Sequence, residues 1–113
     1  MLYSDLRREL AGLTIPFEEG AWCDASDMAQ DYGVYEVESD LSLRADGKIT
    51  ERVWRILVDL YIWGSKGYRQ AHEVEAALER ADVEFELMIS GYEEGNGFTH
   101  WRWQAWAIPS GEV

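Results

Sequence analysis

Apolar residues recur every three or four positions in two stretches of the chain, at residues 2–13 and 68–81. This period is typical of an amphipathic helix that turns one apolar stripe toward a core. The periodic residues are Leu2, Leu6, Leu10 and Leu13 in the first stretch, and Tyr68, Ala71, Val74, Leu78 and Ala81 in the second. We therefore expect a first helix that begins at Ser4 or Asp5 and ends at Gly12, and a second over 68–81.

From Tyr35 onward the period changes to two, which is typical of a strand with one exposed face. Strands are predicted over 35–44, 49–63, 83–90 and 98–108, with hairpin turns at 45–48 and 93–97. Residues 14–31 show little periodicity, and we expect a long excursion with short extended pieces. The order α-β-β-α-β-β predicts one α+β domain over 1–113, with two helices on one face of an antiparallel sheet of about four strands.

The alternation also assigns side chains to the two faces of the sheet. The face predicted to lie under the helices carries Trp54, Ile56, Val58, Leu60 and Ile62, with Val83, Phe85, Leu87 and Ile89 sharing one face of the third strand. Trp101 and Trp103 are expected in the core with Ala105, and Trp106 on the opposite face near Tyr61 or Trp63. The opposite face is half apolar. Its candidate subunit-interface residues are Leu57, Tyr61, Trp63 and Trp106, which in a monomer would instead pack under residues 14–31.

The charge of the chain limits its partners. Asp and Glu number 22 against 10 Lys and Arg, a formal net charge of −12, which opposes extended contact with a phosphate backbone and suits high solubility or basic partners. Because stacking on nucleic-acid bases needs a basic groove, we interpret the C-terminal tryptophans as structural. The single cysteine, Cys23, excludes an internal disulfide and fits a reducing compartment. Without a signal-peptide pattern or an apolar run of membrane length, we expect synthesis in the cytoplasm and no membrane partner.

No catalytic motif is visible in the sequence, which contains no glycine-rich phosphate loop. His72 and Glu75 are three residues apart on the second predicted helix, but a metal site needs three or four converging ligands. Cys23 has no activating base beside it. The glutamate pairs at 36–38 and 84–86 are expected on solvated strand faces. We therefore expect a protein that is not an enzyme and that has no catalytic residue, cofactor or metal.

The order of these parts resembles the small tail-completion proteins of long-tailed bacteriophages, and most closely the tail terminator, or tail-to-head joining, group. The resemblance covers most of the chain and rests on the order and spacing of three common motifs. The matching stretches are "YSDLRREL", "YGVYEVESDLSLRADGKITERVWRILVDLYIWGSK" and "HEVEAALERADVEFE". The last strand departs from the pattern because it carries more tryptophans.

The resemblance implies a non-enzymatic virion protein of a phage or prophage. Such proteins form a hexameric ring at the head-proximal end of the tail, in the neck, where the ring caps the tail tube and joins the tail to the head connector or stopper. DNA would pass through the lumen without specific binding; six copies carry a formal charge of −72, six times −12, which repels DNA. The alternatives are another neck component such as a head-closure ring, a monomeric acidic DNA-mimic inhibitor, and a small enzyme with an unrecognised site.

Overall fold

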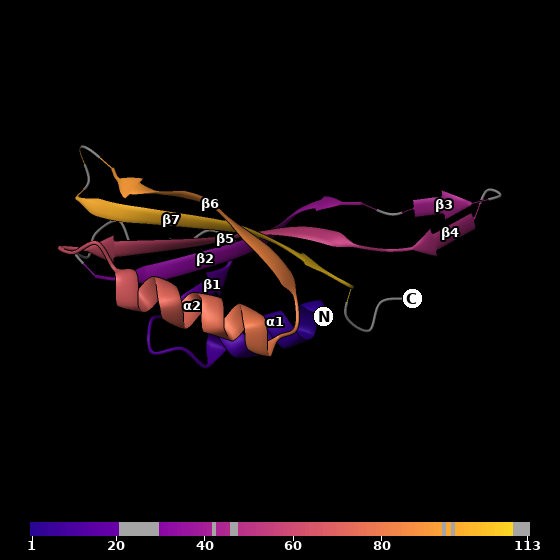
Figure 1. Ribbon diagram of the computed structural model, residues 1–113, viewed down its shortest axis with the longest axis horizontal. Helices are drawn as coiled ribbons and strands as arrows, with labels where there is room; N and C mark the ends of the chain where they lie inside the picture. Colours follow the sequence, from indigo (N-terminus) through magenta and orange to yellow (C-terminus); the bar gives the residue numbers. More distant parts are fainter. Residues whose placement is uncertain (21–29, 42, 46–47, 94, 96, 110–113) are drawn as a thin grey trace.

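Two helices pack on one face of a mixed five-stranded sheet (Figure 1). The structure, a computed structural model, describes residues 1–20, 30–41, 43–45, 48–93, 95 and 97–109. The helices are α1 (Tyr3–Ala11) and α2 (Tyr68–Arg80). In spatial order the strands of this sheet are β1 (Phe17–Glu19), β2 (Tyr32–Asp40), β5 (Trp54–Trp63), β7 (Phe98–Ala107) and β6 (Glu84–Tyr92). β1 and β2 run parallel, and the other neighbours run antiparallel. The α+β class is confirmed, but the prediction of about four antiparallel strands missed β1.

The core lies between the helices and the sheet face that the period of two predicted. Ile56, Val58, Leu60 and Ile62 are fully buried, and Trp54 packs against them at the margin. From β7, Trp101, Trp103 and Ala105 enter the same core, as predicted. The helices contribute Leu6 and Leu10 from α1, and Ala71, Val74, Ala77 and Leu78 from α2. Two predicted core positions are wrong, because Leu2 and Tyr68 lie at the first turns of the helices and are 39% and 61% exposed.

The start of α1 differs from its prediction. The helix begins at Tyr3, with Leu2 as its N-cap and no side-chain cap. The Tyr3 amide donates a hydrogen bond to the Ile108 carbonyl, and the Ile108 amide donates to the Met1 carbonyl. This backbone pairing satisfies one of the amides at the helix start that have no partner within the helix. Gly12 forms the C-cap, in agreement with the predicted end.

The short strand β1 is fixed by a close approach of side chain to backbone. Phe17 pairs with Gly33 in the register of β1 and β2, and a Cβ atom at Gly33 would lie 2.2 Å from the Phe17 ring. The Tyr3 hydroxyl donates a hydrogen bond to Glu19, which ties β1 to α1. β1 is thus one of the extended pieces expected within 14–31, whereas Cys23 lies outside the described residues.

The long hairpin predicted over 35–63 is divided into two parts. The register between β2 and β5 is irregular between Val37 and Ser39. Beyond the paired part of β2 and β5, the two halves of the hairpin continue into a separate two-stranded sheet formed by β3 (Leu43–Ala45) and β4 (Lys48–Glu51). We call β3 and β4 the arm. Figure 1 shows the arm projecting from one end of the molecule, away from both helices. The predicted Asp46–Gly47 turn lies outside the described residues, although Ala45 and Lys48 pair on either side of it.

A second irregularity changes the faces of β6. The register shifts between Leu87 and Ile89, so that Leu87 pairs with Trp103 of the core face and Ile89 pairs with Arg102 of the opposite face. The prediction that Leu87 and Ile89 share a face is therefore wrong, because the extra residue, Met88, interrupts the alternation. Within the described part of the chain, no helix is both long and apolar enough to cross a bilayer.

Candidate subunit interface on the helix-free face of the sheet

The sheet face opposite the helices, which we call the outer face, is built from alternate residues of β2, β5, β7 and β6. β5 and β7 pair along their whole lengths. The outer-face pairs between them are Arg55 with Trp106, Leu57 with Gln104, Asp59 with Arg102, Tyr61 with His100, and Trp63 with Phe98. Three of the four predicted interface residues, Leu57, Tyr61 and Trp63, therefore lie in one row along β5.

An aromatic stack crosses one end of the outer face. Tyr32 of β2 stacks on Tyr61 with ring centroids 4.8 Å apart, and Tyr61 stacks on His100 of β7 at 4.4 Å. Phe98 meets Tyr61 and Trp63 edge-on, at 6.2 Å and 5.2 Å. Burial in this stack, with the nearby carboxylates Asp59 and Glu93, raises the pKa of Tyr61 to about 12. The phenol therefore stays neutral, and only Trp63 of the group is strongly exposed, at 44%.

A charged cluster lies beside the stack. Asp59 is only 5% exposed, and its Oδ1 atom accepts a hydrogen bond from Arg102 Nε at 2.7 Å. The same oxygen lies 2.6 Å from His100 Nε2, and His100 Nδ1 lies 3.4 Å from Glu93 Oε2. The hydrogen bond to Asp59 raises the pKa of Arg102. Sequence reasoning missed this cluster, although Asp59 interrupts an apolar run and His100 and Arg102 alternate on one strand.

Trp106 lies at the other end of the outer face. It pairs with Arg55 and Glu84, whereas Tyr61 pairs with His100, six residues away along β7. At about 3.3 Å per residue the separation is about 20 Å, so the predicted proximity of Trp106 to Tyr61 or Trp63 is wrong. The four candidate residues share a face but form two separate sites.

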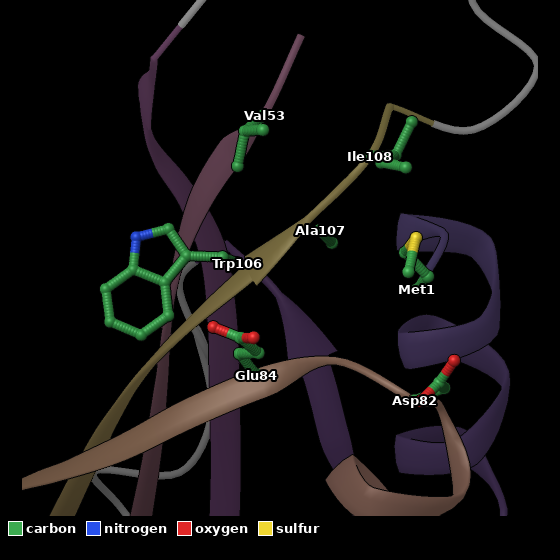
Figure 2. Close-up of a pocket in the computed structure, with 7 residues that line it drawn as sticks. All are labelled: Met1, Val53, Asp82, Glu84, Trp106, Ala107 and Ile108. Carbon is green, nitrogen blue, oxygen red and sulfur yellow. The ribbon is translucent and has the colours of Figure 1, made fainter. Parts of the chain in front are cut away.

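An open cavity of about 430 Å³ borders Trp106. Figure 2 shows the indole at one side, the carboxylates of Glu84 and Asp82 below, and Met1 and Ile108 at the other side, with Val53 and Ala107 completing the lining. Among the described residues, the lining thus combines apolar side chains with two carboxylates and includes no Lys or Arg side chain. A hollow of this composition is suited to an apolar or basic side chain of a partner.

Three of the residues considered for metal binding or catalysis, Glu38, His72 and Glu75, are not part of the cluster of Asp59, His100 and Arg102. Glu75 accepts a hydrogen bond from Trp103 Nε1 at 2.9 Å, which satisfies a polar atom of a core tryptophan, while His72 is exposed. Glu38 pairs with Arg55 at 2.6 Å, and the hydrogen bond from Arg55 lowers the pKa of Glu38. Among the residues that the structure describes, no group of three His, Cys, Asp or Glu could hold a metal ion.

The described part of the 14–31 excursion does not cover the outer face. β1 extends the sheet beside β2 and lies at its edge, and residues 21–29 are outside the described range. The outer face therefore combines packed aromatic rings, internally paired charges and one strongly exposed tryptophan. Comparison with known proteins finds no matching family and no similar curated sequence.

Proposed function

We propose that this chain is a structural virion protein of a long-tailed bacteriophage or prophage, a tail terminator whose copies form a hexameric ring. The observation that carries the proposal is the arm. Among the described strands, β3 and β4 pair only with each other and project from the end of the sheet (Figure 1). Because an isolated two-stranded sheet is marginally stable in water, such an arm is typical of a protein that completes its packing against a neighbour.

The proposed ring closes through contacts between unlike surfaces of successive copies. Heterologous contacts of this kind generate a closed ring when the rotation between copies returns to its start. Leu57, Tyr61, Trp63 and Trp106 of the outer face are the proposed contact residues. The ring would cap the tail tube, end its polymerisation and bind the head connector or stopper. With −12 formal charges on each copy, the lumen would repel the DNA that passes through it.

Three experiments test this proposal. Native mass spectrometry of the purified protein, and of tails that contain it, should reveal six copies of the 13.0 kDa chain. Electron microscopy of labelled particles should place the protein at the head-proximal end of the tail. A phage that lacks the gene should produce tails of uncontrolled length, or tails without heads. Labelling at the distal tip would contradict the assignment.

Two other functions are separated by the same experiments. A head-closure ring would remain on isolated heads rather than on isolated tails. A monomeric acidic inhibitor that mimics DNA is favoured by the net charge of −12. Such an inhibitor would stay monomeric at every concentration and would bind the basic cleft of a DNA-binding protein.

A further inference from the structure

Two adjoining hollows lie where the loop before α2 meets the end of β6 and the start of β7. Their volumes are about 560 Å³ and about 210 Å³, and Lys66, Tyr92 and Thr99 line both. We call the two hollows together the groove. Figure 1 shows this end of β6 and β7, with the start of α2, at the end of the molecule opposite the arm. The larger hollow alone has the size of a small-molecule site, which is typically about 300–1,000 Å³.

The lining of the groove differs in composition from the rest of this acidic chain. Of the eleven described residues that line it, four are aromatic, three are glycines, three are Ser or Thr, and one is a lysine. None of these described residues is aliphatic or carries a carboxylate, although the chain contains 22 Asp and Glu. Aromatic rings beside small hydroxyl residues and glycines are typical of surfaces that bind a ligand by contact area and hydrogen bonds together.

Three of the aromatic side chains expose their rings. Trp63 lines the larger hollow and is 44% exposed, Tyr68 lines the smaller hollow and is 61% exposed, and Tyr92 lines both and is 66% exposed. The Trp63 ring packs on Gly97, where an added Cβ atom would lie 2.5 Å from it. Large aromatic side chains gathered in this way on a surface mark a site of interaction.

Hydrogen bonds beneath the groove hold it in shape. Thr99 Oγ1 donates to the Ser65 carbonyl at 2.9 Å, and Trp101 Nε1 donates to the Lys66 carbonyl at 2.9 Å. These bonds tie the loop before α2 to β7. Tyr68 meets the buried Trp101 edge-on, with ring centroids 5.8 Å apart. The groove is therefore preformed, and a ligand would lose little affinity to the ordering of its walls.

The chemistry of the lining restricts the ligand. A cation would find no carboxylate on the described walls, whereas a polyanion would meet one lysine within a chain of net charge −12. A purely apolar ligand would offer no hydrogen bond to the Ser65 and Ser90 hydroxyl groups as it displaced water from them. The remaining class is a neutral ligand with both apolar faces and hydroxyl groups. A sugar ring has this character, because its C–H groups can face the negative face of an aromatic ring while its hydroxyl groups lie at the rim.

We infer that the groove binds a neutral oligosaccharide. One sugar ring stacks on Tyr92 and a neighbouring one on Trp63 or Tyr68, while sugar hydroxyl groups form hydrogen bonds with the polar side chains of the lining. The inference goes beyond the proposed function and does not depend on it. In the proposed ring Trp63 would be covered by a neighbouring copy, so the decisive substitutions are made at Tyr92.

A titration followed by NMR tests this inference on the purified protein. Maltohexaose, cellohexaose and chitohexaose are added separately to the ¹⁵N-labelled chain. At least one of them should shift the backbone amides of residues 64–67, 90–92 and 97–101 in a saturable way. The Kd should stay constant between about 50 and 500 mM salt, because screening does not act on a ligand without charge.

Substitutions at Tyr92 distinguish stacking from a merely structural role. Tyr92→Ala should weaken binding about tenfold, as expected for the loss of a large aromatic contact, whereas Tyr92→Phe keeps the ring and should bind nearly as well as the wild type. Because Tyr92 is 66% exposed, both variants should melt at the temperature of the wild type. Trp106→Ala is the control, since it removes an aromatic residue from the other end of the outer face, and it should leave the Kd unchanged.

The outcomes separate this inference from the proposed function. If none of the three oligosaccharides shifts these amides, or if Tyr92→Ala binds as well as Tyr92→Phe, the groove is not a saccharide site, and a hexameric ring in tails would still stand. Tighter binding of the anionic trigalacturonate than of all three neutral probes overturns the neutral class of ligand. Saccharide binding by a chain that labels no tail supports the groove and overturns the tail-terminator assignment.

Discussion

Asp59 is the residue on which the outer face depends most. Its carboxylate is almost fully buried on a sheet face that no helix covers, and it binds Arg102 while lying within hydrogen-bond distance of His100. A buried carboxylate is tolerated only when its oxygens are satisfied in this way. The outer face, which the sequence predicted as a contact surface, is therefore stabilised by the charge of Asp59 as well as by its aromatic residues.

Replacing Asp59 with asparagine should lower the free energy of unfolding by about 2 kcal/mol, because Arg102 and His100 lose a charged acceptor. Urea denaturation followed by tryptophan fluorescence would measure the change. Glu38→Gln is the matched control, since Glu38 pairs with Arg55 at 2.6 Å but on an exposed surface, where ion pairs contribute little. Equal effects of the two substitutions would show that burial of Asp59 adds nothing.

The raised pKa of Tyr61 predicts a loss of stability at high pH. The phenol titrates at about 12 in the folded chain against an ordinary value of 10.0, so the unfolded chain releases the proton first. The stabilising contribution is fully present below pH 10 and is lost as the pH rises through 12. The stability of the wild type relative to Tyr61→Phe should therefore fall across this window, as measured by thermal unfolding. A constant difference would mean that folding leaves the titration of Tyr61 unchanged.

At the scale of whole elements, the sequence predicted those helices and strands whose apolar residues recur with a regular period. α1, α2, β5 and β7 each show a clear period, and the core face of β5 was predicted residue by residue. β1 has three residues, too few to show a period, and its place depends on contact with a distant strand. The shift at Met88 was missed because Leu87 and Ile89 keep the spacing of two, although the three consecutive apolar residues at 87–89 interrupt the alternation of apolar and polar positions.

The candidate interface shows the same contrast between features that a local pattern predicts and features that depend on contacts distant in the sequence. Alternation along β5 placed Leu57, Tyr61 and Trp63 on the outer face, because the side-chain period of a strand is fixed by its backbone. The position of Trp106 along that face depends instead on the register between β5 and β7, which are far apart in the sequence. Nothing local to either strand specifies that register, so Trp106 was placed at the wrong end.

The attachment of β1 to β2 should depend on the glycine at position 33. Gly33→Ala places a Cβ atom against the Phe17 ring, and we expect a loss of about 1–3 kcal/mol from the forced displacement. Gly91→Ala is the control in another strand, since no atom lies within 4 Å of its added Cβ. Thermal unfolding of both variants would measure the difference. Equal melting temperatures would mean that β1 moves aside without cost.

At the scale of the whole molecule, exposed apolar residues on the outer face bear on assembly. Trp63→Glu should weaken formation of the proposed ring, because a carboxylate buried at the proposed contact would lack a partner. Trp63 is preferable to Tyr61 for this test, since Tyr61 belongs to the internal stack. Tyr68→Glu is the control, as it adds the same charge at an exposed aromatic in the first turn of α2. Native mass spectrometry that shows equal ring formation by both variants would exclude Trp63 from the interface.

The net charge of −12 also predicts that the purified protein does not retain double-stranded DNA at ordinary salt, because backbone binding depends on the release of counterions by basic side chains. Trp101 and Trp103 are buried in the core and offer no stacking surface. A gel-shift titration would test this. Retention that weakens as salt is added would contradict the prediction.

The continuity of the arm with β5 has a mechanical consequence. β5 occupies the centre of the sheet, hydrogen-bonded to β2 on one side and to β7 on the other. Tension along the arm would pull on β5 at right angles to the hydrogen bonds that join it to β2 and β7, because interstrand hydrogen bonds lie perpendicular to the strands. Both sets of hydrogen bonds would therefore be loaded in shear. Bonds loaded in shear resist together, whereas bonds that are peeled apart fail one at a time. A pull on the arm would therefore be borne by the central strand of the five-stranded sheet, and the protein would transmit force as a stiff link.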